Sequence, residues 1–359
     1  MATAELPEKI EVLREKDAMG GLLPGWARLA AGSATTVTQD AIWSAACAET
    51  VDAGLPLAVV VVGSVEEPRA IAPLVRRGAQ FELLGAGMVH EPSELLAEDD
   101  DALRELADGI AGLRTTVLLH RLPAASASVR ALKQAFRPFG FVVSRDSYGH
   151  GVIRLDEEWT RPEGRLSKRR ASDLRRARRR ATAEGEVDVE LLSPEVSVVD
   201  ELLDEAFAIE ARSWKGREGT ALAVDTVRGA FYRHYCSSAA ERGELRVAFL
   251  RLGDRRVAMQ LAVEWGSQLW LLKIGHDDAV KRCSPGMLLL LEVVRAAAAE
   301  GLEAVQLLGG IEPWTSMWTE DVDECVTVAA YPPGPGSLSA AVGHIRAAAH
   351  SRRQARRRP

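Results

Sequence analysis

Cysteine and histidine are scarce in this chain of 359 residues, and neither is arranged to hold a metal. The four cysteines form no C-x-x-C pair and lie at Cys47, Cys236, Cys283 and Cys325. Cysteines scattered in this way indicate neither a disulfide framework nor a structural zinc site. The seven histidines show no ligand spacing either. We therefore expect no metal.

Long hydrophobic runs are also missing. The longest, such as residues 57–62, fall far short of the roughly 20 apolar residues that a membrane-spanning helix needs. No positively charged leader precedes an apolar segment near the N-terminus, where acidic and basic residues are interspersed. Hydrophobic residues still make up 47% of the chain, enough for the cores of two ordinary domains. We expect a globular, cytoplasmic protein without membrane insertion.

Positive charge is concentrated in two segments. Residues 165–180 hold nine of the 45 basic residues and only one acidic residue, Asp173. The tail from Arg346 onward holds six arginines and no acidic residue. The remainder of the chain is therefore strongly acidic. Because such a body repels phosphates, a protein that coats nucleic acid is disfavoured, although a local basic site is compatible with this pattern.

Residues 269–310 carry the most informative pattern. Residues 269–275 form an apolar run that suits a buried strand, and a short polar loop follows. Ser284 and Pro285 then predict a helix start, with serine as N-cap and proline at the first helical position. The helix, residues 287–300, is apolar on nearly every side and should be buried. A strand at residues 303–308 follows and ends at two glycines.

A helix that begins at the end of a buried strand offers unpaired backbone N–H groups to an anion. Two cationic side chains stand directly before this helix start. The pattern therefore predicts a seat for a pyrophosphate, formed by Lys281, Arg282, Ser284, Gly286, Met287 and Leu288. The alternative interpretation is that serine, proline and glycine here do no more than start a helix.

This stretch resembles the GNAT superfamily of acyltransferases, in particular its FemAB-like tandem members associated with cellulose-biosynthesis acetyltransferases. The similarity rests on Lys273, Asp277, residues 284–289 (SPGMLL) and residues 307–312 (LLGGIE). The general superfamily signature, Q/R-x-x-G-x-G/A, is matched only loosely, by residues 282–288. The resemblance extends from about Trp26 to Tyr331 and implies an acyl-CoA site, with acetyl-CoA as the expected donor.

The order of predicted elements repeats once along the chain. In each half, helical segments lead to three meandering strands, a helix, a strand and a last strand, which is the order of a GNAT domain. The expected helices are residues 38–53, 92–113, 126–136, 202–212, 227–241 and 287–300. The expected strands are residues 57–62, 70–75, 80–84, 115–119, 141–144, 151–155, 245–252, 256–265, 269–274, 304–308 and 325–331.

The repeat predicts an α/β (α+β) protein with tandem GNAT-like domains, each a mixed, largely antiparallel sheet flanked by helices. We expect weak order before Trp26. Only the second half has a basic loop before its helix, so the first half is interpreted as scaffold and substrate wall. The predicted divisions are 1–25 (irregular), 26–160 (N-terminal domain), 161–185 (basic linker helix), 186–335 (domain with the acyl-CoA site) and 336–359 (basic, disordered tail).

The basic segment, residues 166–181, has three interpretations. Its cations cover most of a helix and leave only a thin apolar stripe. It could be a solvated linker that forms salt bridges with the acidic body. It could instead border the cleft and attract an anionic substrate. The third interpretation is RNA contact, since FemAB-like relatives include enzymes that take an aminoacyl group from tRNA.

Acyl transfer from a thioester needs a base, a donor to the oxyanion and an acid for the leaving thiolate. Glu210, followed by Trp214, Lys215 and two glycines, resembles the family's loop over the acceptor site. This implies Glu210 as the base, and Trp214 and Lys215 as acceptor contacts. The alternative is a surface loop anchored by a tryptophan.

His276 and Asp277 follow the strand expected to flank the acyl group, so either could be the base, unless they are simply a solvated pair. Glu312 should lie at the cleft mouth, with Lys273 and Trp314 as further substrate contacts. Relatives carry Tyr-Lys two residues after this glutamate, whereas here Trp314 is followed by threonine. The general acid is thus unassigned, and a changed acceptor or a weakened activity would fit this departure.

The sequence therefore predicts an acyl-CoA-dependent N- or O-acyltransferase that acts on a small molecule or a saccharide precursor. One alternative is an aminoacyl-tRNA-dependent FemAB-like transferase, and another is a non-catalytic binding protein with a decayed CoA site. The sequence does not select the acceptor, the acyl length or the oligomeric state.

Overall fold

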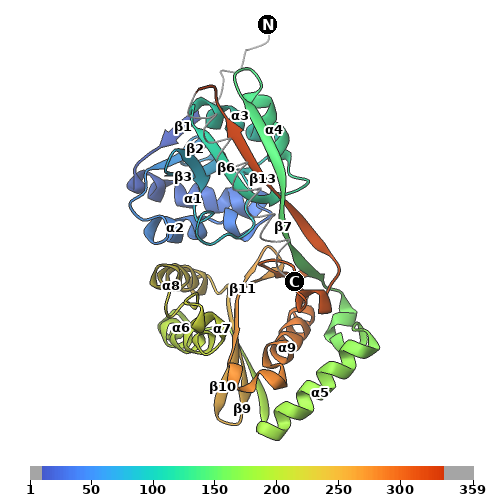
Figure 1. Cartoon of the computed structure of the whole chain (residues 1–359). Helices are drawn as coiled ribbons and strands as arrows, with labels where there is room; N and C mark the ends of the chain where they lie inside the picture. Colours follow the sequence, from blue (N-terminus) through green and yellow to red (C-terminus); the bar gives the residue numbers. More distant parts are fainter. Residues whose placement is uncertain (1–9, 335–359) are drawn as a thin grey trace. The chain divides into compact units, whose positions relative to one another are not determined.

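The structure, a computed structural model, describes residues 10–334 and divides into two compact units (Figure 1). Within the described residues, unit 1 comprises the chain up to Ala48, Asp52–Ser147 and the residues from Cys325 onward. Unit 2 comprises Glu49–Val51 and Tyr148–Glu324. The architecture confirms the predicted fold class, because each unit is a mixed, largely antiparallel sheet flanked by helices.

Unit 1 has the strand order β1-β2-β3-β4-β6-β13, with β5 beside β3. All its neighbouring strands are antiparallel except the pair β4 and β6. Its elements are β1 (Ile10–Leu13), α1 (Lys16–Ser33), the 3-10 helix η1 (Val37–Gln39), α2 (Ala41–Glu49), β2 (Leu57–Gly63), β3 (Pro68–Arg77), β4 (Gln80–Leu83), β5 (Leu96–Ala97), α3 (Asp100–Gly112), β6 (Thr116–Pro123) and α4 (Ala127–Phe136).

Unit 2 has the strand order β7-β12-β11-β10-β9-β8. Only β11 and β12 are parallel in this series. Its elements are η2 (Glu157–Thr160), η3 (Pro162–Gly164), α5 (Lys168–Glu184), β8 (Val187–Leu192), α6 (Val196–Ala211), α7 (Trp214–Arg217), α8 (Thr226–Glu241), β9 (Leu245–Leu252), β10 (Arg255–Trp265), β11 (Gln268–His276), η4 (Asp278–Cys283), α9 (Pro285–Ala299), β12 (Ala304–Leu307) and η5 (Thr315–Met317).

Two strands supply residues to both units, which corrects the predicted domain boundaries. The far end of β7 (Phe141–Arg154) pairs with β12 in unit 2. The far end of β13 (Val322–Tyr331) pairs with β6 in unit 1. Each half of the sequence thus gives its last strand to the other unit, and divisions at 160 and 186 do not describe the compact units.

The predicted strand pair at 141–144 and 151–155 is a single strand. Its glycines suggest a turn from sequence alone, but they allow close backbone approach instead. A Cβ on Gly149 would lie 2.5 Å from the carbonyl oxygen of Asp323. Only glycine can occupy that place without displacing the neighbouring backbone.

Helices cover both faces of the sheet in unit 2. α6 packs on β10 and β11 on one face, and α9 packs on β9, β10 and β11 on the other (Figure 1). α5 packs against α9 through a buried stripe of Ala171, Leu174, Ala177 and Ala181. The basic segment is therefore an integral helix of unit 2, and the prediction of a separate linker at 161–185 is wrong.

Two further expectations for the first half are wrong. Residues 10–25 are not irregular, because α1 buries Met19, Leu22 and Trp26 along one face. The predicted helix at 92–113 begins only at Asp100, since the side chain of Asp99 accepts a hydrogen bond from the Ala102 N–H and caps the helix. The segment before it is extended and forms β5. The predicted tail at 336–359 lies outside the described residues.

Gly140→Ala should lower the free energy of unfolding by about 1–3 kcal/mol, because overpacking forces backbone to shift. The added Cβ would lie 2.3 Å from the carbonyl oxygen of Tyr331. Gly112→Ala is the matched control, since no atom lies within 4 Å of its Cβ position. That change should stabilise the protein by about 0.4–1 kcal/mol. Urea unfolding of both variants measures the difference, and equal midpoints would contradict the packing at Gly140.

Candidate active site

The parallel strands β11 and β12 separate soon after they begin to pair. Their register runs only from Gln268 opposite Ala304 to Trp270 opposite Gln306. β11 nevertheless continues to pair with β10 as far as His276, with a bulge after Leu271. Beyond Trp270, the edge of β11 that faces β12 therefore has no pairing with that strand. The backbone groups on this edge can accept or donate hydrogen bonds to a ligand.

Helix α9 starts just beyond this edge, but not in the way the sequence predicts. Ser284 adopts a left-handed conformation, with φ 48° and ψ 51°, and its side chain makes no capping hydrogen bond. Its own N–H donates to Lys281, while the N–H groups of Met287 and Leu288 donate to the Ser284 carbonyl. Proline has no N–H. Gly286 thus offers the remaining backbone N–H of the predicted pyrophosphate seat.

Cationic side chains surround this helix start. Lys281 and Arg282 are exposed, and neither has an ion-pair partner among residues 10–334. α5 packs against η4, and Arg180 Nη1 donates to the Arg282 carbonyl over 3.2 Å. α5 is further tied to α9 by Arg178 and Glu292, whose charged atoms are 3.2 Å apart. The part of the basic segment nearest α9 therefore adds positive charge to the predicted phosphate site.

His276 is the last residue of β11 and lies over the first turn of α9. Its Nδ1 would be 3.9 Å from a Cβ built on Gly286, and its Nε2 is 3.6 Å from Asp278 Oδ1. The side chain is 36% exposed. Burial lowers the pKa of His276, an effect that Asp278 opposes and Lys215 reinforces. A lowered pKa favours the neutral imidazole, which is able to accept a proton.

Glu210, the predicted base, is 1% exposed, and both of its carboxylate oxygens are engaged. Lys215 Nζ donates to Oε1 over 2.8 Å, and the Leu222 N–H donates to Oε2 over 2.8 Å. Lys215 Nζ also donates to the carbonyl of Ile274 in β11 over 2.8 Å. This arrangement fits a carboxylate that holds the loop of residues 213–222 against β11, rather than one that deprotonates an acceptor.

Asp277 is also held by neighbours. It is buried, pairs with Arg212 at 3.0 Å and Arg255 at 3.1 Å, and caps η4 by accepting from the Ala279 N–H. Its geometry indicates a structural role beside His276. The structure therefore brings Glu210, His276 and Asp277 to the end of β11 but leaves His276 as the partly exposed member.

The predicted substrate contacts are spread over several elements of unit 2. Lys273 projects from β11, with Nζ 4.9 Å from the Tyr232 ring centre. Trp214 is 48% exposed on α7. Trp314 Nε1 donates to Glu312 over 3.0 Å in the segment after β12. Glu312 and Trp314 thus contact each other, and the other two side chains lie on separate elements.

Sequence reasoning missed Asp278, Arg180 and Tyr148. Asp278 is visible in the sequence as the second acid after His276, but its approach to the ring depends on the fold of η4. Arg180 is hidden among many arginines, and only the packing of α5 selects it. Tyr148 Cδ2 would be 3.8 Å from a Cβ built on Gly310. This contact joins β7 to the segment after β12, and the two residues are separated in sequence by more than half of unit 2.

Two absences apply to the part of the chain that the structure describes. No cluster of three histidine, cysteine or acidic residues could hold a metal ion there. No helix in residues 10–334 combines the length and the apolar character needed to cross a bilayer.

Lys215→Met should lower the free energy of unfolding by about 3–5 kcal/mol, because it leaves the Glu210 carboxylate buried without its cation. Glu210→Gln with Lys215→Met should recover part of that loss, since no buried charge remains. Chemical denaturation of the single and double variants provides the measurement. A double variant as unstable as the sum of two independent changes would contradict the coupling.

Comparisons with known proteins agree with the fold described above. Residues 167–316 match the family described as "Acetyltransferase (GNAT) domain". Among solved structures, the C-terminal domain (DUF2156) of an Agrobacterium fabrum protein is 13% identical, with a TM-score of 0.59, and the match covers 91% of this chain and 96% of that one. FemX is 9% identical, with a TM-score of 0.58 and coverages of 90% and 97%.

A conserved protein of unknown function from Bacteroides thetaiotaomicron is 12% identical, with a TM-score of 0.55, and the match covers 90% of this chain and all of that one. At these identities the likeness concerns the fold alone. A search of curated proteins finds no match. Unit 2 therefore carries an acetyltransferase domain of the GNAT family, on a chain that shares its fold with FemX.

Proposed function

We propose that this protein is an acyl-CoA-dependent acyltransferase, with acetyl-CoA as its donor, that acylates an amine or hydroxyl of a small molecule or saccharide precursor. The observation that most supports this is the separation of β11 from β12 directly before the start of α9. It leaves an edge of β11 that β12 does not cover, near a helix start and the exposed cations Lys281 and Arg282. The match of residues 167–316 to a GNAT domain supports the same reaction class.

The chemistry of acyl-CoA suits these groups. Its pantetheine arm carries amides that can pair with the open edge of β11, as an added strand would. Its diphosphate would lie near the Gly286 N–H, Lys281 and Arg282, where a helix dipole and positive side chains favour anions. Gly286 has no side chain to block that approach, and no protein atom lies closer than 3.9 Å to its Cβ position.

His276 is our proposed base. It would take a proton from the acceptor amine or hydroxyl as that group attacks the thioester carbonyl. Backbone N–H groups on the open edge of β11 would stabilise the oxyanion that forms. When the intermediate collapses, the carbon–sulfur bond breaks and the thiolate leaves with the electron pair. The thiolate then needs a proton from an acid.

Tyr148 is our proposed acid. Of the four tyrosines, it alone is exposed, with 51% of its surface accessible. Tyr232, Tyr235 and Tyr331 are buried. Tyr148 also lies beside Gly310, at the end of β12 where the acyl group would be expected. It would replace the phenol that relatives carry after the residue equivalent to Glu312.

One observation favours an aminoacyl-tRNA donor instead. The outward face of α5 presents Lys168, Arg169, Arg175 and Arg179, which are exposed and have no ion-pair partner among residues 10–334. Such a face attracts polyanions. The acidic composition elsewhere opposes tight RNA binding, so the aminoacyl-tRNA donor is our second candidate. A non-catalytic protein is the remaining alternative. An assay that detects acyl transfer would exclude it, and an assay that detects none would favour it.

Arg282→Glu should weaken acetyl-CoA binding at least tenfold while the fold is retained, because it places a carboxylate at the phosphate site. Lys168→Glu makes the same charge change at the far end of α5, about 18 Å along the helix from Arg180. It should leave the affinity nearly unchanged. Isothermal titration calorimetry of both variants gives the comparison.

Equal weakening by both changes would indicate a general charge effect and remove the phosphate site from α9. Tight tRNA binding at about 0.15 M salt, with a steep loss as salt rises, would promote the aminoacyl-tRNA alternative. In that case Lys168→Glu should weaken tRNA binding more than Arg282→Glu does.

His276→Asn should abolish the acid limb of the pH profile of kcat/KM and lower kcat by roughly 10²- to 10⁴-fold. The limb should lie below pH 6.5, since burial lowers the pKa of His276 from its ordinary value. Tyr148→Phe should lower kcat while the acid limb persists. Steady-state rates of the three proteins across pH 5–10 test both roles, and an acid limb retained in His276→Asn would exclude this base.

Stability gives an independent check on His276. Its folded pKa is below its unfolded pKa, so the unfolded state binds the proton first as the pH falls. This contribution therefore destabilises the folded state as the pH falls below about 6.5. His276→Asn should remove that part of the pH dependence.

A further inference from the structure

His276, the proposed base, has two ring nitrogens that face different neighbours. Nε2 is 3.6 Å from Oδ1 of Asp278, the first residue of η4. Nδ1 is directed to the first turn of α9, where a Cβ built on Gly286 would lie 3.9 Å away. A neutral imidazole carries its proton on one nitrogen and accepts a proton at the other. The position of that proton therefore decides the direction in which His276 can act as a base.

Asp278 is held in place from two sides. Its Oδ2 is 2.7 Å from Nη2 of Arg217 on α7, and its N–H donates to the Arg212 carbonyl over 3.3 Å. The Asp278 side chain is 19% exposed, whereas that of Arg217 is 66% exposed. An ion pair with so exposed a cation contributes little to stability. It does orient the carboxylate, and it leaves Oδ1 directed at the ring of His276.

The carboxylate favours one tautomer of the ring. An oxygen with negative charge close to Nε2 attracts an N–H there and repels a lone pair. The proton of the neutral ring is therefore favoured on Nε2, and the lone pair on Nδ1 is directed toward Gly286, beside which acyl-CoA is proposed to bind. When Nδ1 takes the proton of the acceptor, the ring becomes positively charged, and the nearby carboxylate stabilises that charge.

We propose that Asp278 is a positioning residue for His276, which keeps the proton of the neutral ring on Nε2 and leaves Nδ1 as the basic nitrogen. Arg217 supports this role by orienting the carboxylate. The inference rests on the function proposed above, in which His276 is the base. It distinguishes Asp278 from the preceding Asp277, whose carboxylate is engaged by two arginines and by the cap of η4.

Asp278→Asn tests this role, because it keeps the shape of the side chain while its amide can donate to Nε2. NMR of the full chain, with 15N in the histidine rings, shows which nitrogen carries the proton. The His276→Asn variant identifies the His276 signals among those of the seven histidines. We expect Nε2–H in the unaltered protein and a shift toward Nδ1–H in Asp278→Asn. The pKa of His276 should also fall, because a negative charge is removed.

Arg217→Gln tests the same contact from its other side and changes an exposed residue. It leaves Asp278 charged but removes the cation that neutralises it, so the pKa of His276 should rise. Lys215 on α7 and Asp277 also act on the charge of the ring, and neither variant replaces them. Opposite changes in the pKa of His276 in the two variants therefore isolate the effect of the Asp278 carboxylate.

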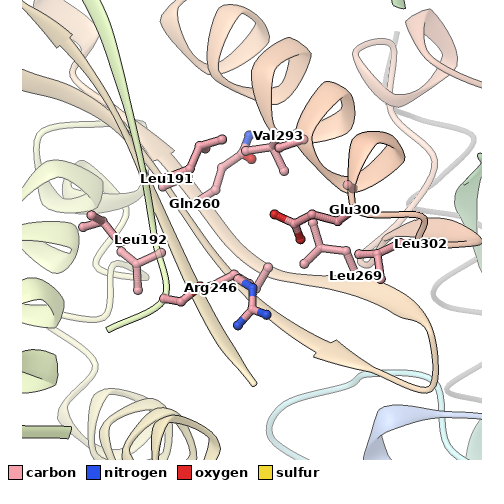
Figure 2. A pocket seen from close by; sticks show the side chains of 14 residues that line it. Leu191, Leu192, Arg246, Gln260, Leu269, Val293, Glu300 and Leu302 are labelled. Carbon is pink, nitrogen blue, oxygen red and sulfur yellow. The ribbon is translucent and has the colours of Figure 1, made fainter. Parts of the chain in front are cut away.

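Glu300→Gln is the matched control, since it removes one carboxylate from unit 2 far from the ring. Glu300 is exposed and has no ion-pair partner in the described part of the chain. It lies at the rim of a pocket of about 80 Å³ at the other end of α9, and Figure 2 shows its carboxylate directed toward the opening. It is 14 residues beyond Gly286, or about 21 Å along a helix. This change should alter neither the tautomer nor the pKa of His276.

Steady-state kinetics separate positioning from donor binding. Asp278→Asn should lower kcat at least about tenfold, while the KM for acetyl-CoA changes less than about twofold, because the carboxylate contacts the base and not the donor. Thermal denaturation shows whether each variant is folded, and the pKa of His276 in Arg217→Gln decides the matter if Asp278→Asn is not.

Two NMR results would overturn the proposal: Nδ1–H as the main tautomer of the unaltered protein, or a tautomer ratio and pKa of His276 that respond to neither variant. Both can occur in a protein that transfers acyl groups, so they leave the proposed function intact. The NMR readout needs no substrate. The expected tautomer change in a chain without acyl transfer would therefore refute the proposed function and support the placement of the ring by Asp278.

Discussion

Backbone pairing of β12 is the constraint on which the candidate site depends. β12 pairs with β7 along all four of its residues, from Ala304 opposite Arg154 to Leu307 opposite Gly151. Its pairing with β11 covers only three. β12 therefore follows β7 and moves away from β11. The open edge of β11 exists because a strand from the first half of the sequence holds its neighbour elsewhere.

The charged residues described in unit 2 are arranged around β11. Glu210 and Lys215 tie α6 and the following loop to the Ile274 carbonyl in β11. Asp277, held by two arginines, fixes the turn that follows β11. These buried groups are satisfied by the protein itself, whereas Lys281 and Arg282 remain exposed. The difference separates residues that build the site from residues available to a substrate.

The sequence predicts local elements well and long-range pairing poorly. The runs at 57–62 and 245–252 are confirmed as strands, since short, mostly apolar runs bounded by turn residues define them locally. The destination of residues 325–331 is not encoded locally, because Val326 pairs with Leu122, about 200 residues earlier. The surroundings of Glu210 were not predictable for a similar reason. Its contacts with Lys215 and Leu222 depend on how a loop folds back.

The exchange of last strands also affects how the chain is made. β6 ends at Pro123, but its partner strand β13 begins only at Val322. At about 5–20 residues per second, the ribosome needs roughly 10–40 seconds to synthesise the intervening segment. During that time one edge of the first sheet has no strand beside it, and open edges recruit other chains. Synthesis speed and chaperone access should therefore influence the yield of this protein more than that of a chain whose domains close one after the other.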